Sequence, residues 1–188
     1  MQVVFRVTEG PQRNKSDLRT LTNHVPQTGR LEAIVLRPGR RAPAVLVTEV
    51  RAIAGQGLDG DRAARTRSAN AAPSRRQVTL IQAEHLPAIA MFVARKVVLP
   101  TELRRNLVIA GVNLLAARSP FKDQTMHLRI GTEVVLKITD VCAPCSRMEE
   151  VLGDGGYAAM RGHGGLTATV LVGGMLRVGD AVRVELAV

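Results

Sequence analysis

Aromatic residues are nearly absent from this chain: it has no tryptophan, and three phenylalanines and one tyrosine make up 2% of its 188 residues. Proteins that bind single-stranded nucleic acid stack the bases on aromatic rings, so this platform is missing. The basic residues, almost all of them arginine, are dispersed along the chain instead of forming a tail. Both features argue against a nucleic-acid partner, which a net charge of +10 and a pI near 11.1 would otherwise suggest.

Cysteine is also scarce, with two residues close together in the sequence. No apolar run approaches the length of a membrane span, and the N-terminus lacks the compact apolar segment and small-residue cleavage site of a signal peptide. We therefore expect a cytoplasmic protein in a reducing compartment, away from membranes. The length favours one domain with one core.

Short apolar segments rich in β-branched residues recur between turns that contain glycine. The predicted strands span residues 31–36, 44–50, 76–81, 106–109, 126–130, 133–139, 166–172, 175–178 and 181–188. The first two are separated by Pro38 and Gly39 and predict a hairpin. Many short strands with few helices predict a mainly β (α+β) fold with a barrel-like sheet.

The strongest helix signal covers residues 82–96, where Pro87 falls in the first turn. Its apolar face consists of Leu86, Ile89, Phe92 and Val93. Residues 1–28 are polar and irregular by contrast, and we predict that they form an extension to a domain of residues 29–188. The segment 62–74, rich in Arg, Ser and Asn, is predicted to be a mobile loop.

Both cysteines lie in the segment Cys142–Glu149. Ser146 and Glu149 have the spacing of a capping box, which predicts a helix of roughly two turns that begins just after Cys145. The amides at the helix start and the cation of Arg147 both favour a thiolate at Cys145. A thiolate is a nucleophile, a sulfur carrier and a soft metal ligand, so Cys145 is the leading candidate for chemistry.

Two roles stay open for Cys142. It is either a small buried side chain that follows the preceding strand into the core, or the partner of Cys145 in a redox disulfide. The flanks of this C-x-x-C do not supply the βαβ pattern typical of oxidoreductases. A zinc site would need two more ligands, and the four histidines (24, 85, 127 and 163) include no pair spaced as H-x₃₋₅-H. His163 either hydrogen-bonds backbone in its glycine-rich loop or transfers a proton, provided that it lies beside Cys145.

Arginine is densest between residues 37 and 76, a stretch that contains nine arginines and three acidic residues. The arginines are residues 37, 40, 41, 51, 62, 65, 67, 75 and 76. A phosphate-bearing small molecule fits this pattern at least as well as DNA, because guanidinium groups bind phosphate in a bidentate manner. The loop of residues 161–165 resembles a phosphate-binding loop only loosely, since it lacks the spacing of either nucleotide motif.

Six segments, in this order along the chain, resemble a MOSC domain, a family named after the C-terminal domain of molybdenum-cofactor sulfurases. They are residues 57–61, 76–81, 104–114, 142–149, 160–165 and 178–182. The resemblance runs from about Gly29 to Val188. It implies a β-rich, barrel-like fold, a molybdopterin-type cofactor, and an essential cysteine that either carries sulfur as a persulfide or ligates molybdenum. Cys145, which follows Pro144, matches that cysteine.

The resemblance further implies arginine and amide donors for the phosphate of the cofactor. The candidates are Asp61, Arg76, Arg105, Asn106, Arg147, Arg161, Gly162, Gly164 and Gly165. Better-characterised relatives often carry His-Gly-Gly ahead of the strand at 76–81, where this chain has Ser68–Pro73.

The implied activity is sulfur transfer or molybdenum-dependent reduction of N-hydroxylated compounds, served by a separate electron-donor or sulfur-donor protein. The alternative is a non-catalytic carrier or sensor of the cofactor, which the lack of a fused redox or pyridoxal-phosphate domain in these 188 residues favours.

Overall fold

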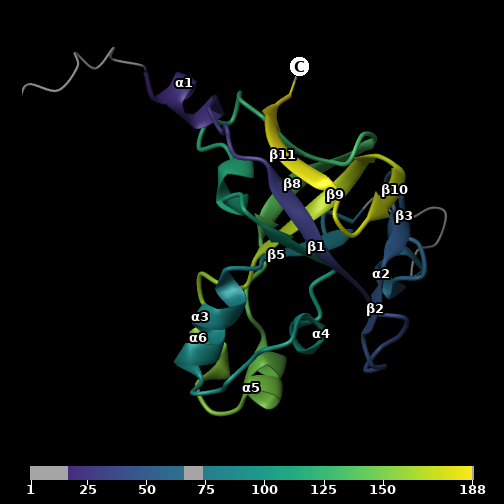
Figure 1. Ribbon diagram of the computed structural model, residues 1–188, viewed down its shortest axis with the longest axis vertical. Coiled ribbons are helices and arrows are strands. Elements are labelled where there is room, and N and C mark those ends of the chain that lie inside the picture. Colours follow the sequence, from purple (N-terminus) through teal and green to yellow (C-terminus); the bar gives the residue numbers. More distant parts are fainter. Residues whose placement is uncertain (1–16, 66–73, 188) are drawn as a thin grey trace, which may run out of the picture.

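A β-barrel closed by seven strands forms the centre of the computed structural model, which describes residues 17–65 and 74–187 (Figure 1). The strands are β1 (Gly29–Leu36), β5 (Val78–Gln82), β6 (Leu107–Ala110), β7 (Met126–Ile130), β8 (Val134–Val141), β9 (Leu166–Val172) and β11 (Ala181–Leu186). They follow the order β11-β7-β8-β9-β5-β6-β1, and β1 closes the ring by pairing with β11. The mainly β, barrel-like fold predicted from the sequence is therefore confirmed.

Aliphatic side chains fill the barrel. β7 alternates strictly, so that Met126, Leu128 and Ile130 are buried while the residues between them are half-buried. Other side chains in this cluster include Leu31, Ile34, Leu80, Leu107, Ile109, Leu136 and Val182. Burying each such Leu or Ile contributes roughly 2 kcal/mol, so the barrel is held together without aromatic rings in this cluster.

Four helices lie together at one end of the barrel (Figure 1), and two of them belong to the connection between β5 and β6, which pair in parallel. A parallel pair needs a crossover connection, and here the crossover carries α3 (His85–Phe92) and α4 (Pro100–Leu103). With α5 (Ser146–Leu152) and α6 (Gly156–Ala159) they cover a second apolar cluster. That cluster consists of Ile81, Ile89, Ala90, Val98, Leu103, Val108, Met148, Leu152 and Met160.

Smaller elements complete the described chain. β2 (Val45–Val47) pairs antiparallel with the end of β1, and α2 (Arg62–Arg65) and the 3₁₀ helix η1 (Leu114–Ala117) lie in connections. A separate three-stranded sheet contains β3 (Glu49–Ile53), β4 (Gly57–Leu58) and β10 (Gly174–Arg177). No helix of the described residues is long and apolar enough to cross a membrane.

Several predicted elements are confirmed. The hairpin is present as β1 and β2, with Leu36 opposite Val45. The segments predicted at 126–130 and 166–172 are strands β7 and β9 with those bounds. The strand predicted at 44–50 is divided, because the chain leaves β2 at Val47 and enters β3 of the other sheet at Glu49.

The helix predicted at 82–96 is too long at both ends. Gln82 still belongs to β5, and the helix ends before Ala94, whose φ of 52° lies in the left-handed region. Ile89 is fully buried as predicted, but Phe92 is 58% exposed, and its ring contacts that of His163 with 5.4 Å between centroids.

The prediction of irregular structure throughout residues 1–28 is wrong for α1 (Leu18–Asn23), which Asp17 caps by accepting from the amide of Thr20. Arg19 ties this helix to the domain through an ion pair with Asp123. The predicted mobile loop begins with α2, and its residues 66–73, with the Ser68–Pro73 segment, lie outside the described part of the chain.

Gly165 lies so close to the barrel backbone that a side chain has no room there, and we predict that Gly165→Ala destabilises the fold strongly. Its φ is 84°, and a Cβ there would overlap the carbonyl oxygen of Leu80. Gly153→Ala is the matched control, because Gly153 has a φ of 92° with open space around it. Chemical denaturation should show a loss larger by about 2 kcal/mol for Gly165→Ala. Equal losses for the two variants would contradict the overlap.

Candidate functional site

The two cysteines occupy different environments at the end of β8. Cys142 is 2% exposed, and its amide donates to the carbonyl of Gly165, which joins this segment to the glycine-rich loop. Cys145 is exposed and is the N-cap residue of α5, so the helix begins just after it, as predicted. One thiol therefore lies in the protein interior and the other at the surface.

The capping box predicted for Ser146 and Glu149 is not formed. The carboxylate of Glu149 accepts instead from the amides of Gly155 and Tyr157, at 2.8 and 2.7 Å. These two bonds lower the pKa of Glu149 and fix the turn between α5 and α6. Glu149 therefore stabilises the end of the cysteine helix rather than its beginning.

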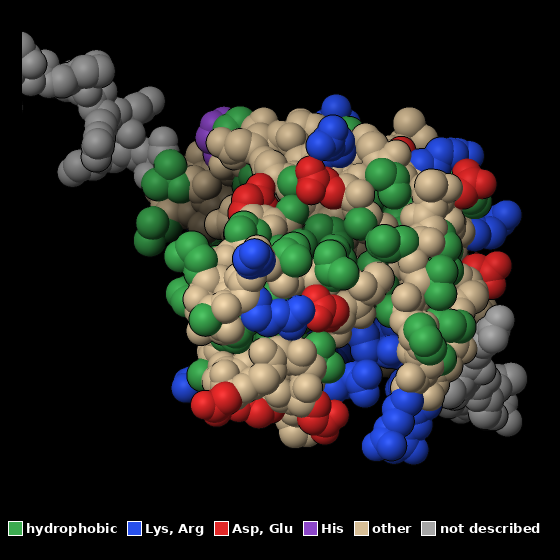
Figure 2. All heavy atoms as spheres, turned by 60° about the horizontal axis from the view of Figure 1, so that its bottom comes forward, with side chains coloured by type: hydrophobic (Ala, Val, Ile, Leu, Met, Phe, Trp, Pro, Cys, Tyr) green, Lys and Arg blue, Asp and Glu red, His purple; other side chains and the backbone are tan. Residues whose placement is uncertain are grey.

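Cys145 lines a cavity of about 490 Å³ that is strongly basic. Six arginines share its wall: Arg37, Arg62, Arg76, Arg104, Arg105 and Arg147. No Asp or Glu of the described residues lines it. Figure 2, which brings the helical end forward, shows Lys and Arg side chains gathered in a recess of this face. The arrangement suits a ligand with several negative charges.

Arg105 is the most deeply placed of these arginines, with 7% exposure. Its Nε donates to the carbonyl of Gly164 at 2.7 Å, and its Nη1 donates to that of Leu103 at 2.8 Å. Burial lowers the pKa of Arg105, and the electrostatic interaction with Cys142 acts in the opposite direction. The guanidinium stays charged at neutral pH, so the protein holds a fixed cation here.

Two further arginines connect the cavity to the cysteine segment. Nη2 of Arg76 donates to Sγ of Cys142 at 2.8 Å. Arg147 follows Cys145 by two residues, and its buried Nε has no hydrogen-bond partner among the described residues. An unpaired buried donor of this kind favours an acceptor on a bound molecule.

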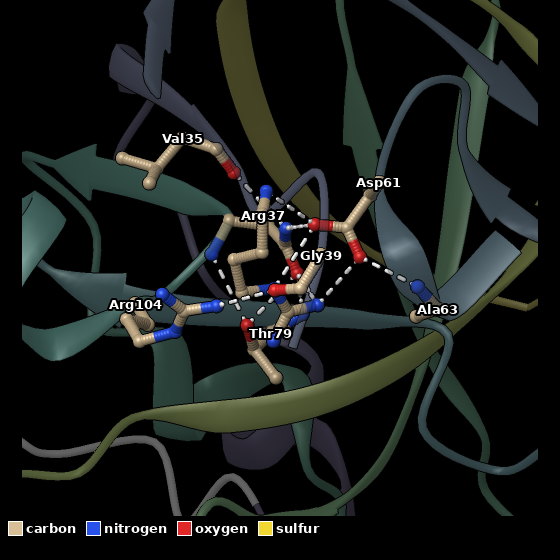
Figure 3. A network of polar contacts seen from close by, with 8 residues as sticks. Val35, Arg37, Gly39, Asp61, Ala63, Thr79 and Arg104 are labelled. Atoms are coloured by element: carbon tan, nitrogen blue, oxygen red, sulfur yellow. Dashed lines mark hydrogen bonds and ion pairs between the residues drawn. The ribbon is translucent and has the colours of Figure 1, made fainter. Parts of the chain in front are cut away.

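Arg37 is held by a buried polar network (Figure 3). The fully buried carboxylate of Asp61 accepts from Nε and Nη2 of Arg37 at 3.0 and 2.9 Å, and also from the amide of Arg37. Burial alone would raise the pKa of Asp61, but the hydrogen bonds and charge of Arg37, together with the amide of Ala63, lower it. Asp61 is thus a carboxylate at neutral pH.

Asn106 completes this network from β5 to β1. Its Oδ1 accepts from Arg37 and from both the amide and the hydroxyl of Thr79, and its Nδ2 donates to Asp61 and to the carbonyl of Val35. Asn106 and Asp61 are both 0% exposed, and neither lines the basic cavity. They act on that cavity by fixing Arg37.

The structure divides the predicted site residues into groups. It brings Cys145, Arg76, Arg105 and Arg147 together in the basic cavity. Cys142, Arg161, Gly162, Gly164 and Gly165 line a neighbouring apolar cavity. His163 lines neither cavity, and its ring lies edge-on to His85 at 4.9 Å. It therefore shares no cavity with Cys145.

Sequence reasoning did not single out Arg37, Arg62 or Arg104 as site residues. Arg104 stands inside a segment that carries the family resemblance, and its guanidinium donates to the carbonyls of Ala42 and Gly39. Arg37 and Arg62 belong to the arginine-dense stretch, which was the one sequence signal available for them.

Loss of the Asp61 charge should destabilise the fold. Asp61→Asn leaves Arg37, 16% exposed, without its counter-ion, and we expect the free energy of unfolding to fall by about 3 kcal/mol. Asp123→Asn breaks the exposed pair with Arg19 and should cost less than about 1 kcal/mol.

The effect of Asp61→Asn also depends on pH. A lowered carboxyl pKa stabilises the fold above the ordinary value near 4, and this stabilisation is lost as the pH falls through the folded-state value. Urea denaturation at a series of pH values should therefore show wild type and Asp61→Asn converging in acid. A constant difference down to pH 2 would contradict the assignment.

Comparisons with known proteins agree with this architecture. The structure is similar to the YuaD protein from Bacillus subtilis, with a TM-score of 0.70 and 16% identity over 88% of this chain and 100% of that one. It is also similar to YiiM from Escherichia coli, with a TM-score of 0.57 and 17% identity over 85% of this chain and 70% of the other. YiiM from Geobacillus stearothermophilus gives a TM-score of 0.58 at 16% identity, over 85% of this chain and 75% of that one.

At these identities the likeness shows the fold alone. No curated protein sequence matches the chain. The model of the MOSC domain matches residues 60–183, which is more than half of the chain and includes the cysteine segment and five of the six cavity arginines. Together with the closed barrel, this match shows that the chain belongs to the MOSC domain family.

Proposed function

We propose that the chain binds a molybdenum cofactor in the basic cavity, with Cys145 as the ligand of the metal or as the carrier of its sulfur. Membership of the MOSC family makes this a molybdenum-cofactor-related domain. The observation that carries the finer proposal is the opening of an exposed cysteine into the same cavity as six arginines. A soft thiolate and a phosphate-binding cluster are the two groups that such a cofactor needs.

The charges in the cavity fit a phosphate-bearing pterin. Burial and the positive charges of Arg147, Arg37 and Arg62 lower the pKa of Arg104, which means that the arginines repel one another across the cavity. A bound phosphate would relieve this repulsion and could accept from the unpartnered Nε of Arg147. The residues present therefore fit the group that the family implies.

Each part of the chain has a defined task in this proposal. Arg105 is fixed by two carbonyls through Nε and Nη1 and makes no hydrogen bond through Nη2 within residues 17–65 and 74–187, and Arg37 is oriented by Asp61. Gly164 contributes by anchoring Arg105 through its carbonyl. When bound, the cofactor would supply a molybdenum centre for sulfur transfer or for reduction of an N–O bond. A separate protein would provide the sulfur or the electrons.

The metal-ligand role can be tested by metal analysis of protein from a host that makes the cofactor. We expect molybdenum and pterin in wild type, a loss of more than about tenfold in Cys145→Ser, and retention in Cys142→Ser. The two variants are matched, because each removes one thiol from the same segment. Molybdenum retained in Cys145→Ser would overturn this role, and a wild-type protein with a persulfide but no molybdenum would support the sulfur-carrier alternative instead.

The anion site can be tested without the cofactor. Arg147→Gln should weaken pyrophosphate binding about tenfold by calorimetry, because one charge-assisted contact is lost. Arg183→Gln on β11 is the control, since Arg183 is exposed and lies outside the cavity. Affinity should also fall as salt is raised. Equal binding by the two variants would contradict a role for Arg147 in holding phosphate.

A further inference from the structure

A second cavity, of about 280 Å³, lies against the same cysteine segment and has the opposite character. Its apolar wall includes Leu114, Leu115, Val141, Pro144, Met160 and Leu166. Among the described residues that line it, Arg161 is the one Asp, Glu, Lys or Arg. Arg161 is exposed, so its charge is solvated. An apolar hollow with few polar groups is the usual form of a small-molecule site.

The polar groups of this cavity favour an uncharged occupant. Oε1 of Gln82 accepts from the amide of Leu114 at 3.2 Å, which orients the side chain. The amide nitrogen of Gln82 makes no hydrogen bond within the described residues, so it offers a donor. Burial, together with the neighbouring imidazole of His163, lowers the pKa of His85, which is therefore neutral at physiological pH. An occupant should carry a hydrogen-bond acceptor and no charge.

Size and lining indicate a ring compound. Small-molecule pockets begin near 300 Å³, so this cavity suits one or two rings. Tyr157 and Met160 both line it, and phenol rings and thioethers make favourable contacts with aromatic groups. Tyr157 is 46% exposed and is held in place at its amide by Glu149.

We propose that this cavity binds an uncharged aromatic or heteroaromatic small molecule that carries a hydrogen-bond acceptor. The occupant would contact Cys142, whose Sγ accepts from Arg76 of the basic cavity. It would thus lie against the segment that bears Cys145, beside the anion site but separate from it. The proposal stands independently of the cofactor, because neither Cys145 nor the six arginines of the basic cavity line the apolar one.

The single tyrosine of the chain provides a specific probe, because it lines this cavity. Protein labelled with ¹³C-tyrosine gives the ring signals of Tyr157 alone. We expect benzamide to shift these signals saturably, with a dissociation constant of roughly millimolar order for so small a ligand. Benzoate, which has the same ring with a charge in place of the amide, should bind at least about tenfold more weakly.

The matched variants are Leu115→Glu and Leu46→Glu, at side chains that are 50% and 58% exposed. Leu115 lines the cavity and Leu46 does not, so Leu115→Glu should weaken benzamide binding about tenfold while Leu46→Glu leaves it within about twofold of wild type. Cys145→Ser should bind benzamide like wild type, which separates this result from the cofactor proposal. The absence of a saturable shift, equal binding of benzoate, or equal effects of the two glutamate variants would overturn the inference.

Discussion

The buried carboxylate of Asp61 is the interaction on which the arrangement of the basic cavity depends. It joins the end of β1, through Arg37, to the turn before α2 and to Asn106 at the start of β6. Three segments far apart in the sequence are thus fixed by one charge that water does not reach. A buried charge is tolerated when its partners satisfy it fully, and here the partner is itself a cavity arginine. The stability of this end of the barrel and the orientation of Arg37 in the basic cavity therefore depend on the same atoms.

A second constraint links the glycine-rich loop to the cysteines. The amide of Cys142 donates to Gly165, and Arg105 donates to Gly164, so the loop carries both the thiol segment and the deepest arginine. Gly164 and Gly165 have no room for a side chain, because a Cβ at either would overlap a carbonyl, of Cys142 or of Leu80. The loop that loosely resembles a phosphate-binding loop in the sequence is thus a site of close backbone contact. It lines the apolar cavity and holds Arg105 of the basic cavity. The glycines are required by packing, whatever the ligand.

The sequence predicted those features that depend on local pattern. Strands β7 and β9 are bounded by turns and keep a clear apolar face, so their limits could be read directly. The helix at 82–96 could not, since nothing local reveals that Ala94 adopts a left-handed conformation. The predicted capping box does not form, because the carboxylate of Glu149 accepts from two amides beyond the helix instead. Asp61 and Asn106 are candidates by sequence, but their burial depends on pairings across 24 to 71 residues that no motif describes.

The division of the site into two cavities follows from the geometry of the cysteine segment. Residues 142–145 connect β8 to α5, and Ala143 and Pro144 contribute to the apolar cavity while Cys145 contributes to the basic one. Arg76 bridges the two by donating to the buried thiol of Cys142 from the basic side. An anionic group and an uncharged ring bind poorly in one environment, because the first needs cations and the second needs their absence. A short segment with one buried and one exposed thiol would give each of the two proposed ligands its own environment and would keep both close to the same few residues.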